Sequence, residues 1–392
     1  MYLHDFYTSM DYNSAMETLA ILTPYENFLY GLKVPETRRQ YPHRLDKFMT
    51  FIGLEGETIQ QKTNKLYDMG KNNPELLQSC VERFIHTQKQ RIANKEIAEG
   101  TLANYIKAIK LFCSMNDLLI INWTKIGKGM PAERHSADDR IPTSDEIKKL
   151  LEHPDRRIKI IVSVMISSGI RVGSFDYLQW KHVIPIERNG DIVAAKLIVT
   201  NTKINNRHYY SFITPEAYNL LKDYMDFRAL YGEKITGESW LIRDTWQKIE
   251  RNKEHGHRLG LAKYPRKIGS ITIRNMLYEA WQVQGVRPKL SGTRNHEFKS
   301  SHCFRKTFET KGQKVMNHNN IKLLMDHSLG ESQNYHRPTE DELLDDYLNV
   351  IDLVTLNEEN RLRMKVEKLE VEKSEVQELA LELRKVKQMI GM

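Results

Sequence analysis

The stretch Ser301-His302-Cys303-Phe304-Arg305 decides the fold that we predict for this 392-residue chain. If the stretch is helical, its histidine and arginine lie three residues apart on one face. Arg171, in Ser168-Gly169-Ile170-Arg171-Val172-Gly173, supplies a second guanidinium, and Tyr335 follows Arg305 by 30 residues. Guanidiniums stay charged at neutral pH and match phosphate oxygens, whereas a tyrosine needs a proton acceptor before it can act as a nucleophile. Together these groups have the chemistry that in-line attack on a phosphodiester requires.

Each of these residues also has an ordinary structural interpretation. An arginine at a helix end often has no partner, and a lone tyrosine among the 18 in this chain more often packs than reacts. No carboxylate cluster with metal-ligand spacing accompanies them, so the sequence predicts that arginines, not a metal ion, meet the transition-state charge. His255 and His257 lack further ligands at the spacing of a metal site. We therefore expect no metal and no cofactor.

Length and composition predict a cytoplasmic protein of at least two domains, because 392 residues exceed what one core organises. The longest apolar run, residues 158–170, is too short to span a bilayer, and the N-terminus lacks the features of a signal peptide. Three widely spaced cysteines predict no disulfide framework. No association with a membrane is expected.

The net charge of +8 and the pI near 9.1 favour a polyanionic partner, of which nucleic acid is the commonest. In residues 358–388, eight basic residues balance eight glutamates, so the whole excess lies in residues 1–357. The signal is weak by itself, since many cytoplasmic proteins are mildly basic.

Apolar residues at three- and four-residue spacing predict a helical domain over residues 37–126. Residues 1–36 form an N-terminal extension without an assigned role, and the Gly- and Pro-bearing residues 127–140 read as a linker. Basic residues of this domain face either a phosphate backbone or solvent: Arg38, Arg39, Lys107 and Lys110. The expected helices are Thr37–Gly53, Pro74–Asn94 and Gly100–Asn116.

A second domain is expected over residues 141–350, with helices around a small sheet. A capping box, Thr143-Ser144-Asp145-Glu146, opens a helix to Leu151, and an apolar helix, Arg157–Ser168, ends at Gly169. Two β-rich runs flank the polar turn Asn201–Arg207: Lys196–Thr200 and His208–Ile213.

The C-terminal segment, residues 351–392, is predicted to form a long helix. Apolar residues recur there every seven positions, while lysines occupy two of the other core positions of the heptad. Two interpretations stay open: a coiled coil, or a single amphipathic helix that packs on the protein. The repeated residues are Leu362, Leu369, Val376, Leu383 and Ile390, and the lysines are Lys373 and Lys387.

Four sequence boxes resemble those of the tyrosine recombinases, the lambda-integrase family. The run from Ser168 to Val183 resembles the first-arginine box, and His302-Cys303-Phe304-Arg305 resembles the H-x-x-R box. Met325-Asp326-His327-Ser328 and Tyr335-His336-Arg337-Pro338 resemble the final histidine and tyrosine boxes, in a form more similar to archaeal than to bacterial integrases. The boxes occur in the order of the family, and the resemblance covers residues 37–350.

The resemblance implies a mainly α fold with a small β-sheet: a helical core-binding domain and a mixed α/β catalytic domain that close around double-stranded DNA. It implies a site-specific recombinase or integrase that cuts and rejoins DNA through a 3′-phosphotyrosyl intermediate, without metal or ATP. Members of the family act as tetramers on DNA, so a homotetramer is expected.

The resemblance also implies a role for each matching residue. Arg171 and Arg305 would hold the scissile phosphate, His302 and His327 would hydrogen-bond it, and Tyr335 would attack phosphorus. A lysine in a β-hairpin turn protonates the leaving oxygen in this family. Lys203 lies in the predicted turn and is the candidate for that role; its nearest rivals are Lys196 and Arg207.

The chain departs from the family at three points. The acidic residue that usually follows the first arginine by three positions is replaced by Ser174, with Asp176 nearby. Asp326 stands where the family has glycine. The interval from His327 to Tyr335 is eight residues, one shorter than is common, and His336 occupies the longer spacing.

Two other functions remain as alternatives. Type IB topoisomerases use a similar set of residues, but they typically carry lysine at the position of His302. A DNA-binding protein on a decayed integrase scaffold would explain Ser174 and Asp326, but not the presence of all six candidate residues.

Overall fold

The computed structural model describes residues 22–118, 122–131, 139–201, 207–244, 246–247, 259–261, 266–290, 296–331 and 335–389. The chain divides into two compact units, Met1–Ser136 and Ala137–Met392. Each unit has its own hydrophobic core. Among the described residues, no helix combines the length and the apolar character needed to cross a membrane.

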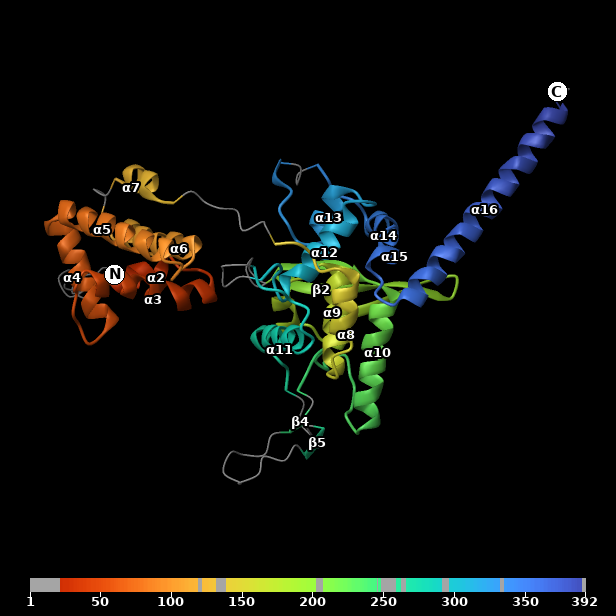
Figure 1. Ribbon diagram of the computed structural model, residues 1–392, viewed down its shortest axis with the longest axis horizontal. Helices are drawn as coiled ribbons and strands as arrows, with labels where there is room; N and C mark the ends of the chain where they lie inside the picture. Colours follow the sequence, from red (N-terminus) through yellow and green to blue (C-terminus); the bar gives the residue numbers. More distant parts are fainter. Residues whose placement is uncertain are drawn as a thin grey trace, which may run out of the picture. The chain divides into compact units, whose positions relative to one another are not determined.

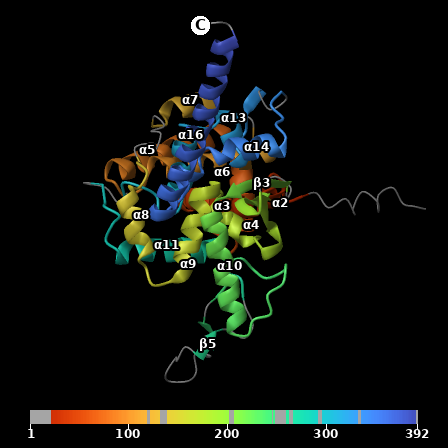
Figure 2. The ribbon, with the colours of Figure 1, turned by 90° about the vertical axis from the view of Figure 1, so that its right-hand side faces the viewer.

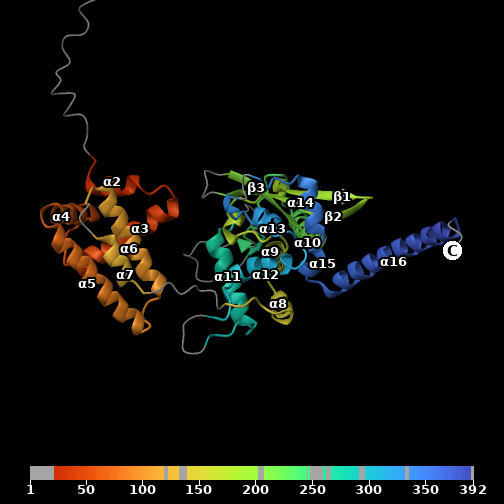
Figure 3. The same ribbon diagram turned by 90° about the horizontal axis from the view of Figure 1, so that it is seen from above.

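The first unit is helical, as predicted (Figures 1 and 3). Side-chain caps at Thr58, Asn73 and Asn122 start three of its helices. The helix expected over Gly100–Asn116 forms, and it buries Leu102 and Phe112 fully. Its helices are α2 (Pro24–Tyr30), α3 (Pro35–Phe51), α4 (Ile59–Asn72), α5 (Pro74–Ala93), α6 (Glu99–Met115) and α7 (Trp123–Gly129).

Helix α2 belongs to the core of this unit. Phe28 is fully buried, and its ring meets that of Phe112 edge-on at 5.9 Å between centroids. Part of the segment expected as an N-terminal extension is therefore built into the helical unit. Residues 1–21 lie outside the described residues.

The second unit is mainly helical with a small antiparallel sheet, which confirms the predicted fold class (Figure 1). Its elements are α8 (Ser144–Leu151), α9 (Arg156–Ser168), the 3-10 turns η1 (Val172–Asp176) and η2 (Trp180–His182), β1 (Val183–Arg188), β2 (Asp191–Asn201), β3 (Arg207–Ile213), α10 (Pro215–Leu230), β4 (Trp246–Gln247), β5 (Leu259–Leu261), α11 (Ser270–Val283), α12 (His302–Gly312), α13 (His318–Leu324), α14 (Glu340–Leu348), α15 (Ile351–Val354) and α16 (Glu358–Met389).

Helix α9 forms the centre of this unit, in contact with α8, α10, α11, α12, α15 and β3. Its serines are buried with its apolar residues, and Ser167 satisfies its hydroxyl by donating to the Ser163 carbonyl at 2.7 Å. Figure 2 shows that α10 and β5 lie toward one end of the unit, and α13 and α14 toward the other. The predicted apolar helix is thus the element around which the site is built.

The sheet has the order β1-β2-β3, with all pairs antiparallel. In β2, Ala195, Leu197 and Val199 are buried at alternate positions, so one face of the strand packs inward. The register pairs Leu197 with Ser211 of β3. Residues 202–206, which join β2 to β3 and include Lys203, lie outside the described residues.

The chain ends in the long helix α16, as predicted. Leu343, Leu344 and Tyr347 of the preceding α14 are buried in the core of the unit. In α16, Met364 packs against that core. Leucines and valines farther along the helix are 53–65% exposed, and the coiled coil stays a prediction.

Candidate functional site

The site begins at the C-terminal end of α9, where helix carbonyls lack partners within the helix. Side chains from three other elements satisfy them: Tyr347 of α14 donates to Ser167 O (3.0 Å), Ser211 of β3 donates to Ser168 O (2.8 Å), and Arg305 of α12 donates through Nη1 to Gly169 O. This hydrogen bonding fixes the turn that leads into Arg171.

Gly169 is required at this turn for two reasons. Its φ of +63° lies in the left-handed region, which side chains with a Cβ disfavour. A Cβ would also lie 2.5 Å from Cδ1 of Phe308 and 3.1 Å from Cγ of Met325. The glycine therefore lets the end of α9 approach α12 and the residue that follows α13, which brings the arginine box to the H-x-x-R box.

Arg305 is buried, with 1% of its surface exposed. Its Nη2 donates to the Met325 carbonyl and lies 2.7 Å from Nε2 of His327, while its Nε is buried without a hydrogen-bond partner. Among the described residues, no carboxylate forms an ion pair with it. Burial, and after it the nearby charge of Arg171, lower the pKa of Arg305 to about 10. The guanidinium is still charged near pH 7 and has no carboxylate ion-pair partner in the part of the chain that the structure describes, which favours an anionic ligand beside it.

Arg171 follows Gly169 and Ile170, at the start of η1. Its side chain is 38% exposed, and its Nη1 lies 3.6 Å from Oδ2 of Asp326. That distance is an ion-pair contact but is too long for a hydrogen bond. Among the described residues, most N–H donors of Arg171 therefore have no partner and are available to a ligand. Arg171 lies close enough to lower the pKa of Arg305, and two such neighbouring guanidiniums favour an anion between them.

The two candidate histidines share this environment. His302 is partly open to solvent. Desolvation by the surrounding protein lowers the pKa of His302, and the charge of Arg305 contributes in the same direction. The same two causes, in the same order, lower the pKa of His327. Because arginine can only donate, Nε2 of His327 must accept from Arg305, which leaves the proton of a neutral ring on Nδ1. Both histidines can therefore be neutral near pH 7.

The lowered pKa of His327 predicts a loss of stability in acid. Above about pH 6.5, the ordinary histidine pKa, the ring is neutral in both the folded and the unfolded chain. As pH falls below that value, the unfolded chain binds the proton first, so the free energy of unfolding decreases. The free energy of unfolding can be measured with urea at about pH 7.5 and at about pH 5.5. Between these two values it should decrease less in His327→Gln than in the wild type. Glutamine keeps an acceptor for Arg305 and does not titrate; equal losses would contradict the prediction.

The structure brings together Arg171, His302, Arg305 and His327. Tyr335 is 90% exposed and forms no hydrogen bond with these four residues. Lys203 lies outside the described residues. Both rivals of Lys203 are engaged with carboxylates, Lys196 with Glu340 at 2.5 Å and Arg207 with Asp326 at 3.2 Å.

Sequence reasoning missed Tyr209. Its hydroxyl is buried beside Ser174 without a hydrogen bond of ordinary geometry, and burial raises its pKa while Arg305 and Arg171 oppose that rise. Tyr209 lies in β3, and no motif distinguishes it from Tyr210, the neighbouring tyrosine of the strand. Cys303, between His302 and Arg305, is fully buried and does not enter the site.

Comparisons with known proteins give matches among solved structures. The chain is similar to XerA recombinase (20% identity, TM-score 0.35, 83% of this chain and 96% of that one). It is similar to XerH site-specific recombinase bound to a palindromic difH substrate (13%, 0.44, 82% and 93%), and to a lambda integrase tetramer bound to a Holliday junction (13%, 0.41, 78% and 84%). No protein-family model and no curated protein matches. In its sequence motifs and in these solved structures, the chain is similar to the tyrosine recombinases.

Proposed function

We propose that this protein is a site-specific DNA recombinase or integrase of the tyrosine type, which cuts and rejoins DNA without metal or ATP. The observation that carries the proposal is the buried Arg305, which has no carboxylate partner among the described residues and lies close to Arg171. Two such guanidiniums suit a phosphodiester, whose transition state places extra charge on the non-bridging oxygens. The two histidines beside them can exchange protons near neutral pH.

In the proposed reaction, the Tyr335 oxygen attacks phosphorus and the bond from phosphorus to the 5′-oxygen breaks. The tyrosine proton passes to neutral His302, and Lys203 gives a proton to the leaving oxygen. The products are a 3′-phosphotyrosine and a free 5′-hydroxyl. Attack by a 5′-hydroxyl reverses these steps, and because the ester keeps the bond energy, rejoining needs no ATP.

Double-stranded DNA is the proposed partner. The excess of positive charge lies in residues 1–357, and Arg38, Arg39, Lys107 and Lys110 are exposed in the helical unit. Arg39 also forms an ion pair with Glu36, at 2.7 Å. Binding through phosphates should weaken steeply with salt, because counterions are released.

The test is a denaturing gel of the protein with nicked suicide DNA, in which the cut strand loses its 5′-hydroxyl end and cannot be rejoined. In excess EDTA and without ATP, a covalent adduct at the 3′-phosphate is expected. An adduct that forms only with Mg²⁺ would contradict the metal-free mechanism. No adduct on any of a broad set of candidate sites, with DNA binding retained, would favour a binding protein.

The role of Lys203 makes a separate prediction. Lys203→Ala should reduce cleavage of ordinary DNA, because the alkoxide then leaves without a proton. DNA with a 5′-bridging phosphorothioate should restore most of the rate, since a thiolate leaves without protonation. Lys196→Ala is the matched control and should need no rescue. Equal rescue of Arg305→Ala would remove the specific assignment of Lys203.

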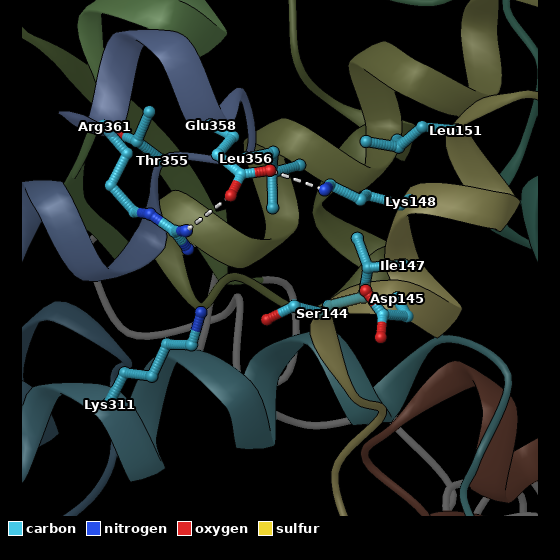
Figure 4. Close-up of a pocket in the computed structure, with 10 residues that line it drawn as sticks. All are labelled: Ser144, Asp145, Ile147, Lys148, Leu151, Lys311, Thr355, Leu356, Glu358 and Arg361. Carbon is cyan, nitrogen blue, oxygen red and sulfur yellow. Dashed lines mark hydrogen bonds and ion pairs between the residues drawn. The ribbon is translucent and has the colours of Figure 1, made fainter. Parts of the chain in front are cut away.

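We also propose a homotetramer on DNA, with α16 contributing to assembly. The first turns of α16 are attached to their own unit (Figure 4): Glu358 pairs with Lys148 of α8 at 2.6 Å and with Arg361 at 3.8 Å. A cavity of about 170 Å³ lies beside this attachment, where Lys311 donates to Leu353 O at 2.6 Å. The exposed heptad residues begin just beyond, at Leu362, so the attached base leaves the apolar stripe open to another copy.

Truncation after Asn357 should therefore lower the oligomeric mass on DNA while cleavage of a single site is spared. Light scattering with and without DNA measures the mass, and the suicide substrate measures cleavage. Substitution of Leu369 and Val376 by serine in the full chain is a milder variant that keeps the helix attached. An unchanged mass in both variants would exclude the assembly role.

A further inference from the structure

Asp326 combines a left-handed backbone with a buried carboxylate. It follows the end of α13 with a φ of +53°, a region in which glycine is comfortable and most other residues are strained. Its side chain is only 4% exposed. Burying a carboxylate is costly unless it is paired, which implies that the charge of Asp326 interacts with specific neighbours.

The two oxygens of Asp326 face two different arginines. Oδ2 lies 3.6 Å from Nη1 of Arg171, and Oδ1 lies 3.2 Å from Nη2 of Arg207, the first residue of β3. The carbonyl of the preceding residue, Met325, accepts a hydrogen bond from Nη2 of Arg305. One short segment therefore holds both arginines of the site, one through a backbone oxygen and the other through a carboxylate.

Ser174 cannot hold the Arg171 side chain in this way. Its backbone N–H donates to the Arg171 carbonyl at 2.9 Å, so η1 fixes the backbone of that arginine. The Ser174 hydroxyl carries no charge to attract a guanidinium, and it lies beside the Tyr209 hydroxyl. Among the described residues, Asp326 is the carboxylate that forms an ion pair with the Arg171 side chain, and it is therefore the candidate to orient it.

We propose that Asp326 is a positioning residue, which orients Arg171 toward the scissile phosphate and ties it, through Arg207, to the start of β3. The inference rests on the proposed function. Because the Arg171 contact is an ion pair without a hydrogen bond, it directs the guanidinium while leaving its donors to the phosphate oxygens. The shared carboxylate also links Arg171 to β3, the strand that begins at Arg207.

The test compares Asp326→Asn and Asp326→Gly with the wild type on the suicide substrate. Both replacements tolerate a positive φ, so they remove the charge without adding strain. Without the carboxylate, Arg171 would no longer be directed at the phosphate, and adduct formation should slow by about 10- to 100-fold. Non-covalent DNA binding should change far less. Asp345→Asn, which removes a carboxylate paired with Arg188 at 2.7 Å, is the matched control and should keep the wild-type rate.

A second background separates positioning from a merely structural role. In Arg171→Lys, whose side chain lacks the guanidinium fork, Asp326→Asn should slow the residual reaction by no more than about 2-fold, since coupled residues are not additive. Equal slowing in both backgrounds, or a wild-type or faster rate for Asp326→Asn, would overturn the inference.

Urea unfolding keeps this inference distinct from the proposed function. A cycle of Arg171→Gln, Asp326→Asn and the double variant measures the coupling of the pair without any DNA. Coupling is expected even if the wild type forms no adduct, an outcome that would defeat the proposed function. An additive cycle would show that Asp326 does not hold Arg171.

Discussion

Replacement of Tyr335 by phenylalanine is expected to abolish the covalent protein–DNA adduct while DNA binding persists. The substitution removes only the oxygen that would form the ester, and at 90% exposure the Tyr335 ring contributes little to the core. The melting temperature should therefore stay at the wild-type value. The measurement is a denaturing gel with suicide DNA, together with a binding titration of the same duplex.

Tyr347→Phe is the matched control, because it removes the same atom from a buried tyrosine of the same unit. The Tyr347 hydroxyl donates to Ser167 O at 3.0 Å, and complete burial raises its pKa well above 10. Loss of this hydrogen bond leaves a buried carbonyl unsatisfied and should cost about 1–3 kcal/mol of stability. At a temperature where the variant is folded, it should still form the adduct.

Opposite results for the two variants would assign the chemistry to one tyrosine. Peptide mapping of the adduct locates the modified residue directly. DNA found on Tyr347, on Tyr209 or on any tyrosine other than Tyr335 would contradict the assignment, and so would an adduct of normal yield from Tyr335→Phe.

Much of the fold follows from local signals in the sequence. The capping box at Thr143 and Glu146 forms as predicted at the start of α8. Helix α9 ends, also as predicted, at Gly169, which has a left-handed backbone. The two strands that flank the polar turn pair in the antiparallel register typical of a hairpin. Each of these elements is determined by residues close together in the chain, which is why sequence periodicity and caps predict them.

The sequence predicts which residue types belong to the candidate site, but it does not predict their contacts. Arg305 meets Gly169 across 136 residues of sequence, and Asp326 meets Arg207 across 119. Such contacts depend on how α9, α12 and β3 pack, which no local pattern encodes. In sequence, Asp326 is only a carboxylate near a phosphate site; its pairing with two arginines is visible only in three dimensions.

Arg305→Lys is the second variant with a large expected effect. The guanidinium fork of Arg305 reaches Gly169 O, Met325 O and His327 at once, and a lysine ammonium cannot reproduce that planar geometry. Adduct formation should fall by about 10²- to 10³-fold, as when one donor to the transition state is lost. At least one buried carbonyl would lose its partner, so stability should fall by about 1–3 kcal/mol.

Arg228→Lys separates the two consequences of losing a buried guanidinium. Arg228 is as buried as Arg305, but it pairs with Glu233 at 2.5 Å, so its charge is already neutralised within the protein. Its replacement should lower the free energy of unfolding without slowing cleavage by the folded fraction. A 5′-bridging phosphorothioate should not rescue Arg305→Lys, because the missing interaction is with the non-bridging oxygens. If Arg305→Lys cleaved at the wild-type rate, or if Arg228→Lys lost as much activity at equal folding, the buried guanidinium without a carboxylate partner would not be the phosphate site.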